Sequence, residues 1–264
     1  MIWLYLLLAT GLAIAVYSLT FARWRWSVQR SEAAVLPKGA KPIRVLHISD
    51  IHMAPWQHGK QRFIKQLISL QPDLIVNTGD NLGHTDAIAP TLSALGPLLD
   101  VPGVFVNGSN DYYAPVLRNP LAYLAKPSER SEGPLIETAR LINGFTSAGW
   151  LNLNNRQGVI KLGSLKIGLI GVDDAHDELD NLASIESQVK AIGACDILIG
   201  VTHAPYLRVL ESMGSAGANI IFAGHTHGGQ VCLPVIGALT TNCDLPNKYA
   251  KGLSAWSFAN KKVF

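Results

Sequence analysis

From residue 43 onward, short apolar runs alternate with stretches whose apolar residues recur at helical spacing. Residues 43–48 and 74–76 are strand-like, and the apolar positions between 63 and 68 fall on one face of a helix. A strand, a helix and a second strand of this length form a right-handed βαβ unit with parallel strands. The sequence therefore predicts an α/β fold for residues 43–264.

The same alternation continues through the rest of this region. Helices are predicted at residues 87–99, 135–148, 181–193 and 205–213, and strands at residues 104–106, 159–162, 165–172, 197–201 and 219–223. Gly163-Ser164 separates two of these strands and predicts a β-hairpin. Residues 112–134 are rich in proline and polar groups, so we expect them to form an excursion over the surface.

The N-terminal segment has a different composition. Residues 2–22 carry no charge and are mostly leucine, alanine, isoleucine and aromatic residues, and about 20 such residues suffice to cross a bilayer. A signal peptide is the alternative, but its basic residues would precede the apolar run, whereas here three arginines follow it, at positions 23, 25 and 30. The positive-inside rule then places the bulk of the chain in the cytoplasm.

We therefore expect three parts: a transmembrane anchor at residues 1–22, a juxtamembrane linker at 23–42 and an α/β domain at 43–264. The protein would be a single-pass protein of the cell membrane. The three cysteines show no C-x-x-C spacing, which argues against a disulfide framework and a thiolate zinc site. A scattered net charge of +3 gives no reason to expect a nucleic acid partner.

Polar residues that can bind metals gather where the predicted strands end, which is where ligands bind in open α/β sheets. Singly, such residues are usually turn formers or helix caps, but five such loops in one chain need another explanation. The set lacks cysteine and suits Mn²⁺, Fe²⁺ or Zn²⁺. Its members are Asp50 and His52, Asp80, Asn110 in the stretch 108–111, His203, and His225 with His227.

The last of these loops, Gly224-His225-Thr226-His227-Gly228-Gly229, follows the strand at 219–223. In extended chain, residues i and i+2 share a face, so both histidines can serve adjacent metal ions. The glycines allow the backbone to approach a ligand closely. The alternative interpretation is a pair of histidines in a surface loop.

In this order, the motifs resemble those of the calcineurin-like metallophosphoesterases, whose signature is D-x-H, G-D, G-N-H-D/E, a lone H and G-H-x-H. The resemblance covers roughly residues 43–243. The apolar N-terminus and the His-Thr-His-Gly-Gly-Gln ending of the last motif are similar to a membrane-associated bacterial branch of that family.

The resemblance implies two facing mixed β-sheets flanked by helices, and two divalent metal ions. Asp50, His52 and His227 would hold one ion, while His203, His225 and Asn110 would hold the other, with Asp80 bridging both. Two such ions can activate a bridging hydroxide for hydrolysis of a phosphomonoester or phosphodiester. Asp80, Asn110 and His225 would then be the catalytic residues, and the substrate a phosphorylated small molecule or lipid head group.

Two features depart from the family pattern. The third motif reads Gly108-Ser109-Asn110-Asp111, so a gapless alignment puts Ser109 at the ligand asparagine and Asn110 at the catalytic histidine. A hydroxyl is a poor ligand, and we expect a local shift that makes Asn110 the ligand. The chain also ends early, at Phe264, which suggests a truncated gene product. The alternative function is therefore a catalytically weakened fold that serves as a scaffold or phosphate-ligand sensor.

Two further polar residues, Asp111 and His176, are interpreted without a catalytic role. Asp111 could replace the missing histidine as an acid, but beside two dications it should stay ionised and donate protons poorly. His176 is expected to be solvated.

Overall fold

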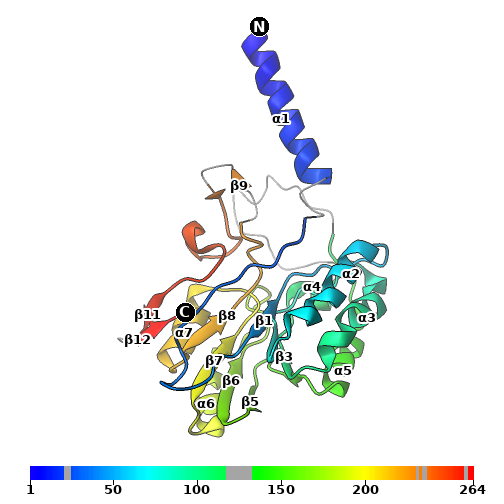
Figure 1. The fold of residues 1–264 in the computed structure, drawn as a ribbon. Coiled ribbons are helices and arrows are strands. Elements are labelled where there is room, and N and C mark those ends of the chain that lie inside the picture. The colour runs from blue at the N-terminus through cyan, green and yellow to red at the C-terminus, as the bar shows by residue number, and fades with distance from the viewer. Residues whose placement is uncertain (21–24, 117–132, 230–231, 234–236, 259–260) are drawn as a thin grey trace.

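The computed structural model describes the whole chain except residues 21–24, 117–132, 230–231, 234–236 and 259–260. Arg23, most of the expected surface excursion at 112–134 and Gln230 lie outside the described residues. The body is built from two four-stranded sheets with helices on their outer faces (Figure 1). This confirms the α/β class.

The first sheet has the strand order β1-β2-β3-β4, and all its neighbours are parallel. Helices connect successive strands, and a chain that crosses over through a helix returns in the same direction. The expectation that both sheets are mixed is therefore wrong for the first sheet. Its elements are β1 (Val45–Ile48), α2 (His58–Gln66), β2 (Leu74–Asn77), α3 (Ile88–Leu99), β3 (Gly103–Phe105), α4 (Ser109–Tyr112), α5 (Thr138–Ser147) and β4 (Leu151–Asn152).

The second sheet is mixed, as expected, with the order β5-β6-β7-β8. The predicted hairpin is confirmed: β5 and β6 are antiparallel and joined at Gly163-Ser164, whereas β6, β7 and β8 are parallel. Its elements are β5 (Gln157–Leu162), β6 (Leu165–Gly171), α6 (Ile185–Ile192), β7 (Ile197–Val201), α7 (Leu207–Ser215) and β8 (Ile220–Phe222). Short 3₁₀ helices occur at Leu67–Leu70, Thr85–Ala87, Leu182–Ser184 and Asn247–Tyr249.

Alternation along the strands separates the core into layers. In β2, Leu74 and Val76 face the second sheet and pack in one cluster with Ile167 and Ile199, so the two sheets lie face to face. Ile75, between them, belongs instead to the cluster under α2, α3 and α5. The result is a helix–sheet–sheet–helix sandwich, with α6 and α7 covering the outer face of the second sheet.

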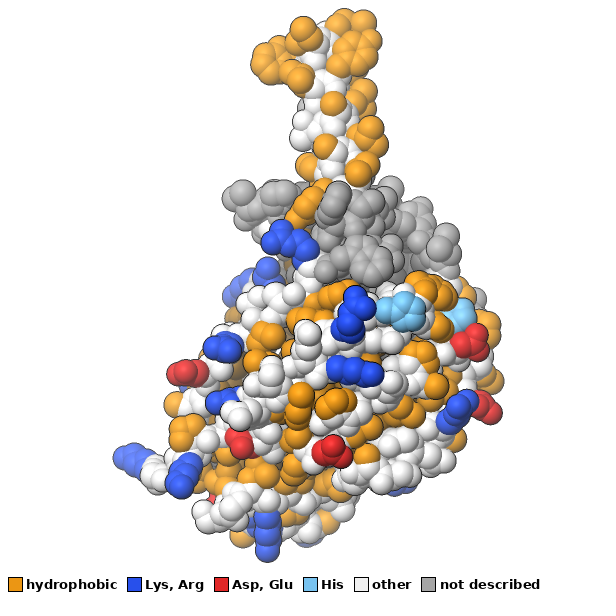
Figure 2. All heavy atoms as spheres, turned by 45° about the vertical axis from the view of Figure 1, so that its right-hand side comes forward, with side chains coloured by type: hydrophobic (Ala, Val, Ile, Leu, Met, Phe, Trp, Pro, Cys, Tyr) orange, Lys and Arg blue, Asp and Glu red, His pale blue; other side chains and the backbone are white. Residues whose placement is uncertain are grey.

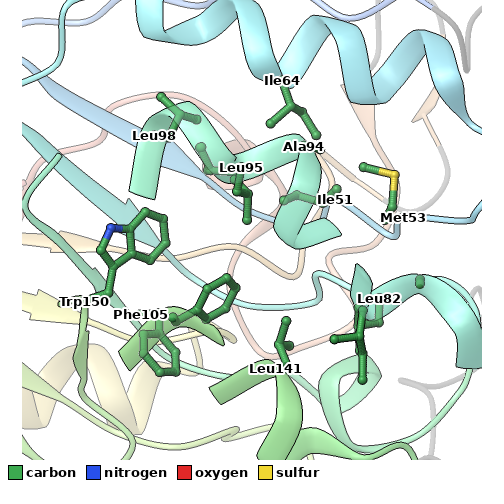
Figure 3. Close-up of a cluster of buried hydrophobic side chains, with 14 of the residues drawn as sticks. Ile51, Met53, Ile64, Leu82, Ala94, Leu95, Leu98, Phe105, Leu141 and Trp150 are labelled. Atoms are coloured by element: carbon green, nitrogen blue, oxygen red, sulfur yellow. The ribbon is translucent and has the colours of Figure 1, made fainter. Parts of the chain in front are cut away.

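Large aromatic side chains fill the cluster beneath the helices of the first sheet (Figure 3). Phe145 of α5 lies between Phe105 of β3 and Trp150, with ring centroids 4.9 and 5.3 Å away. The Trp150 indole N–H donates to the Val101 carbonyl at 3.1 Å, which satisfies its one polar atom. Gly103 is required here because a β-carbon would overlap that indole ring.

The C-terminal residues attach to the second sheet. After the short strands β9 (Cys232–Leu233) and β10 (Gly237–Ala238), β11 (Trp256–Phe258) and β12 (Lys261–Val263) form an antiparallel hairpin. The Ile221 N–H donates to the Phe264 carbonyl at 2.7 Å, and the Phe264 N–H donates to the Asn219 carbonyl at 3.2 Å. The last residue thus pairs with the edge of β8.

The N-terminal helix α1 (Ile2–Thr20) projects away from this body, and hydrophobic side chains line it (Figures 1 and 2). Among the described residues, no helix has both the length and the apolar character needed to cross a membrane. The predicted transmembrane anchor is therefore not confirmed. Part of the expected linker packs on the body, because Val35, Leu36 and Ala40 contact the cluster between the sheets.

Candidate metal centre

The seven predicted metal ligands come together at the carboxyl ends of the strands. Asp50 and His52 follow β1, Asp80 follows β2, and Asn110 lies in α4 after β3. The second sheet contributes from β7 and β8, whose following loops carry its three histidines, His203, His225 and His227. The facing sheets bring these loops to one edge of the sandwich.

One group of ligand atoms surrounds His52. Its Nε2 lies 3.2 Å from the Nε2 of His227 and 3.5 Å from the Oδ2 of Asp80. The Nε2 of His227 in turn lies 3.4 Å from the Oδ1 of Asp50. Asp50, His52 and His227 are close enough to share one metal ion.

A second group surrounds His203, which is fully buried. Its Nε2 lies 3.6 Å from the Oδ2 of Asp80 and 3.3 Å from the Nδ1 of His225. Asp50, Asp80 and His203 also lie close enough to share an ion. The same Asp80 oxygen therefore contacts a histidine of each group, and Asp50 reaches both groups as well.

These spacings fit metal coordination. Two donor atoms bound at about 2.0–2.1 Å to one ion lie about 2.8–3.0 Å apart in octahedral geometry and about 3.3–3.4 Å apart in tetrahedral geometry. The contacts between His52, His227, Asp50, Asp80 and His203 run from 3.2 to 3.6 Å. Carboxylate oxygens and imidazole nitrogens suit Mn²⁺, Fe²⁺ or Zn²⁺, so the residues present fit a divalent ion in each group.

The backbone of this site is strained at the ligands themselves. Asp50, His52, Asp80, His225 and His227 all have left-handed φ angles, between +41° and +67°. Residues other than glycine rarely adopt this region, and such strain concentrates at functional sites. The turn after β1 brings Asp50 and His52 to one group of ligand atoms, whereas the turn after β8 sends His225 and His227 to different groups.

The odd third motif places Asn110, rather than Ser109, against Asp80. The backbone N–H of Asn110 donates to Asp80 Oδ1 at 2.8 Å, and its side-chain Nδ2 donates to Oδ2 at 2.9 Å. A half-turn of the amide would present its carbonyl oxygen from the same position. Ser109 is buried at the start of α4.

A neighbouring carbonyl fixes the tautomer of His203. The Nδ1 of His203 lies 2.7 Å from the Thr78 carbonyl, which only accepts, so Nδ1 carries the hydrogen and Nε2 faces the centre. The Nε2 of His225 lies 3.3 Å from the Asn242 carbonyl and 3.4 Å from the Asn242 side-chain Nδ2, while its Nδ1 faces His203. Asp50 accepts from the Ser49 hydroxyl at 2.6 Å. It also accepts from the backbone N–H of His225, which joins the first and last loops.

The charges at this edge of the sandwich favour a cation. Burial alone would raise the pKa of Asp80, but His203, His52 and the hydrogen bonds from Asn110 hold that pKa well below its usual range. Burial opposes a charge on His203 too, yet Asp80 and Asp50 raise its pKa to about 9. The carboxylates of Asp80 and Asp50 thus favour a positive charge at this point.

The carboxyl group of Asp111 serves the backbone. It accepts from the N–H groups of Gly108 and Asn81 at 3.1 and 2.8 Å and is fully buried. Burial and the charge of Asp80 raise its pKa to about 7. We expected Asp111 to stay ionised, but its burial disfavours the charged form. The carboxyl group of Asp111 holds two ligand loops together.

His176 is the residue whose place was not expected from the sequence. It is half-buried rather than solvated, and its ring centroid lies 4.6 Å from that of His225. Its Nδ1 is 3.0 Å from the Tyr206 hydroxyl. A sequence signal existed, since His176 follows the end of β6 and therefore lies at the same edge as the ligands.

Comparisons with known proteins give a family match and several relatives. The calcineurin-like phosphoesterase family matches residues 43–229. YpbG of Bacillus subtilis is 26% identical over 196 residues, which are 74% of this chain and 64% of that protein. A transmembrane protein with metallophosphoesterase domain from Danio rerio is 24% identical over 230 residues, or 83% of this chain and 48% of that protein.

The chain thus spans about half to two thirds of the length of these relatives. Among solved structures, TT1561 of Thermus thermophilus has a TM-score of 0.44 and 14% identity over 84% of this chain and 88% of that one. The family match covers every ligand loop described above, from the one after β1 to the one after β8. This chain belongs to the calcineurin-like phosphoesterase family.

Proposed function

We propose that the chain hydrolyses a phosphomonoester or phosphodiester with two divalent metal ions, Mn²⁺, Fe²⁺ or Zn²⁺. Asp50, His52 and His227 would hold the first ion, and Asp80 would be shared. His203, His225 and Asn110 would hold the second ion. The observation that carries the proposal is the position of Asp80 Oδ2, which lies 3.5 Å from His52 Nε2 and 3.6 Å from His203 Nε2.

When bound, two such ions supply a nucleophilic hydroxide at neutral pH and a clamp for the phosphoryl oxygens. The protein's part is to hold Asp80 ionised, to keep His203 Nε2 aimed at the centre and to hold the Asn110 loop through Asp111. No imidazole follows Gly108 to protonate a leaving group. Since one positioned acid contributes about 10²–10⁴-fold in rate, we expect esters with acidic leaving groups to be preferred.

The test is metal content and aryl ester hydrolysis by the full chain. We expect two metal ions per chain and cleavage of p-nitrophenyl phosphate or bis(p-nitrophenyl) phosphate with Mn²⁺, Fe²⁺ or Zn²⁺. The exposed Asp100 provides a matched control, so Asp80→Asn should abolish hydrolysis while Asp100→Asn leaves it unchanged. A protein that binds both ions but cleaves neither ester would instead be the scaffold or phosphate sensor.

We also propose that α1 attaches the protein to the cell membrane, with the body on the cytoplasmic side and a phosphorylated small molecule or lipid head group as substrate. Large apolar residues of α1 are exposed, among them Leu4, Leu8 and Leu12. Two relatives, from Danio rerio and Bos taurus, are named as transmembrane proteins. The full chain should sediment with membranes, and a variant without residues 1–22 should not. Equal distribution of the two would contradict the attachment.

A further inference from the structure

A hollow of about 430 Å³ adjoins the metal centre on the side of the second sheet. The segment after β6 and the start of α7 form its walls. His176 lines it and also lies against the proposed ligand His225, with 4.6 Å between ring centroids. A group bound in this hollow therefore lies next to whatever the metal centre holds. Its volume is in the range of about 300–1,000 Å³ that is typical of small-molecule sites.

The guanidinium of Arg208, which lines this hollow, already has hydrogen-bond partners in the protein. The Nη2 of Arg208 donates to Asp180 Oδ1 at 2.6 Å and to the Ala175 carbonyl at 3.0 Å. Its guanidinium lies over the Tyr206 ring, 4.8 Å from the centroid. Arg208 is thus part of the wall, with its charge neutralised by Asp180. It is a poor receptor for a second phosphate or a carboxylate.

Most of the remaining lining side chains are polar, and Ala175 and Leu182 add apolar surface. Glu178 adds a carboxylate, so the formal charges of Glu178, Asp180 and Arg208 sum to one negative charge. Asn181 and Tyr206 can both donate and accept hydrogen bonds, and Tyr206 with His176 adds aromatic edges. Carboxylates, amides and phenols with aromatic carbon nearby suit a neutral group that carries several hydroxyls.

We propose that this hollow binds the esterified alcohol of the substrate, and that this alcohol is a neutral, hydroxyl-rich group such as a sugar or polyol. The phosphoryl group would lie at the metal centre and the hydroxyls between the walls of the hollow. This inference rests on the proposed function, because it assigns the second half of the same substrate.

Two phosphate esters with the same ring size and the same CH₂ linkage test the inference. Glucose 6-phosphate and cyclohexylmethyl phosphate both carry a six-membered ring on a CH₂ group, but only the first has hydroxyls on the ring. The dissociation constant of each is measured with the metal-loaded full chain by the ligand-induced rise in Tm. We expect glucose 6-phosphate to bind about 10-fold more tightly, because several hydrogen bonds are made only by its hydroxyls.

Paired variants keep the test specific. Glu178→Gln with Asn181→Ala should bring the two dissociation constants to within about threefold. Glu186→Gln with Asn143→Ala makes the same changes at exposed positions outside the hollow and should leave the 10-fold preference intact. Equal binding of both esters by the wild type, or a preference that survives the first pair, would overturn the inference. Hydrolysis of aryl esters is assayed separately, so a failure of the proposed function remains distinguishable.

Discussion

Asp80→Ala should cost the protein both metal ions. Asp80 is 4% exposed, and its Oδ2 contacts His52 and His203, one from each ligand group. Its removal takes a negative charge and a donor atom from both sites at once. His52→Ala removes a donor from the first group only, so we expect that variant to keep one ion.

The size of the expected stabilisation follows from the linkage between metal binding and folding. A ligand present at 100 times its dissociation constant stabilises the folded state by about 2.7 kcal/mol, so two independent ions give about 5 kcal/mol. For a chain of this size, that corresponds to a rise in Tm of about 10–20 °C. Asp80→Ala should lose the whole rise, and His52→Ala about half of it. Each variant is compared with itself after chelation, so that changes in the metal-free protein cancel.

The assay combines elemental analysis with thermal unfolding. We expect two ions per wild-type chain, one for His52→Ala and none for Asp80→Ala, with the exposed Asp100→Ala as the unchanged control. If the wild type holds one ion or none after metal loading, the dinuclear assignment is refuted. If Asp80→Ala keeps two, the bridging role of Asp80 is wrong, and Asp50, which reaches both groups, is the better choice.

Three further outcomes are expected. Asn110→Ala should weaken the metal affinity of the second site at least about 10-fold, and Ser109→Ala much less, because Asn110 contacts Asp80. A larger loss of affinity in Ser109→Ala would show that the gapless alignment, with Ser109 as the ligand, is right. The raised pKa of His203 stabilises the metal-free fold by roughly 2–4 kcal/mol, fully below about pH 6.5, and this stabilisation should be lost as pH rises through about 9. Chemical denaturation of the chelated wild type and of chelated His203→Asn measures it, and identical dependence of stability on pH in the two proteins would contradict it. Gly224→Ala should lower metal content, because a β-carbon there would overlap the Ser49 hydroxyl and lie 2.7 Å from Asp50 Oδ2. Full metal occupancy of this variant, measured by elemental analysis, would show that the loop adapts.

The sequence predicted most of the fold because its signals are local. The strand at 197–201 was predicted with the bounds it has, and the other predicted strands and helices overlap observed ones, since buried strands and amphipathic helices alternate clearly from residue 43. The short elements α4, β4 and β9 to β12 were not predicted. The strand–helix–strand pattern predicted that β1 and β2 are parallel, which is confirmed, whereas the family resemblance implied two mixed sheets, which is wrong for the first sheet. The helical crossovers, visible in the sequence, were the better guide to its parallel order.

The sequence by itself determined which residues could be ligands, because each ligand follows an apolar strand and parallel strands end at the same edge. Which atoms meet was decided only by the packing of one sheet on the other. That packing brings Asp80 Oδ2 between His52 and His203 and turns Asn110 towards it. It also lays His176 against His225 and buries the carboxyl of Asp111. Such contacts depend on the distance and tilt between sheets far apart in the chain, and no local pattern records them.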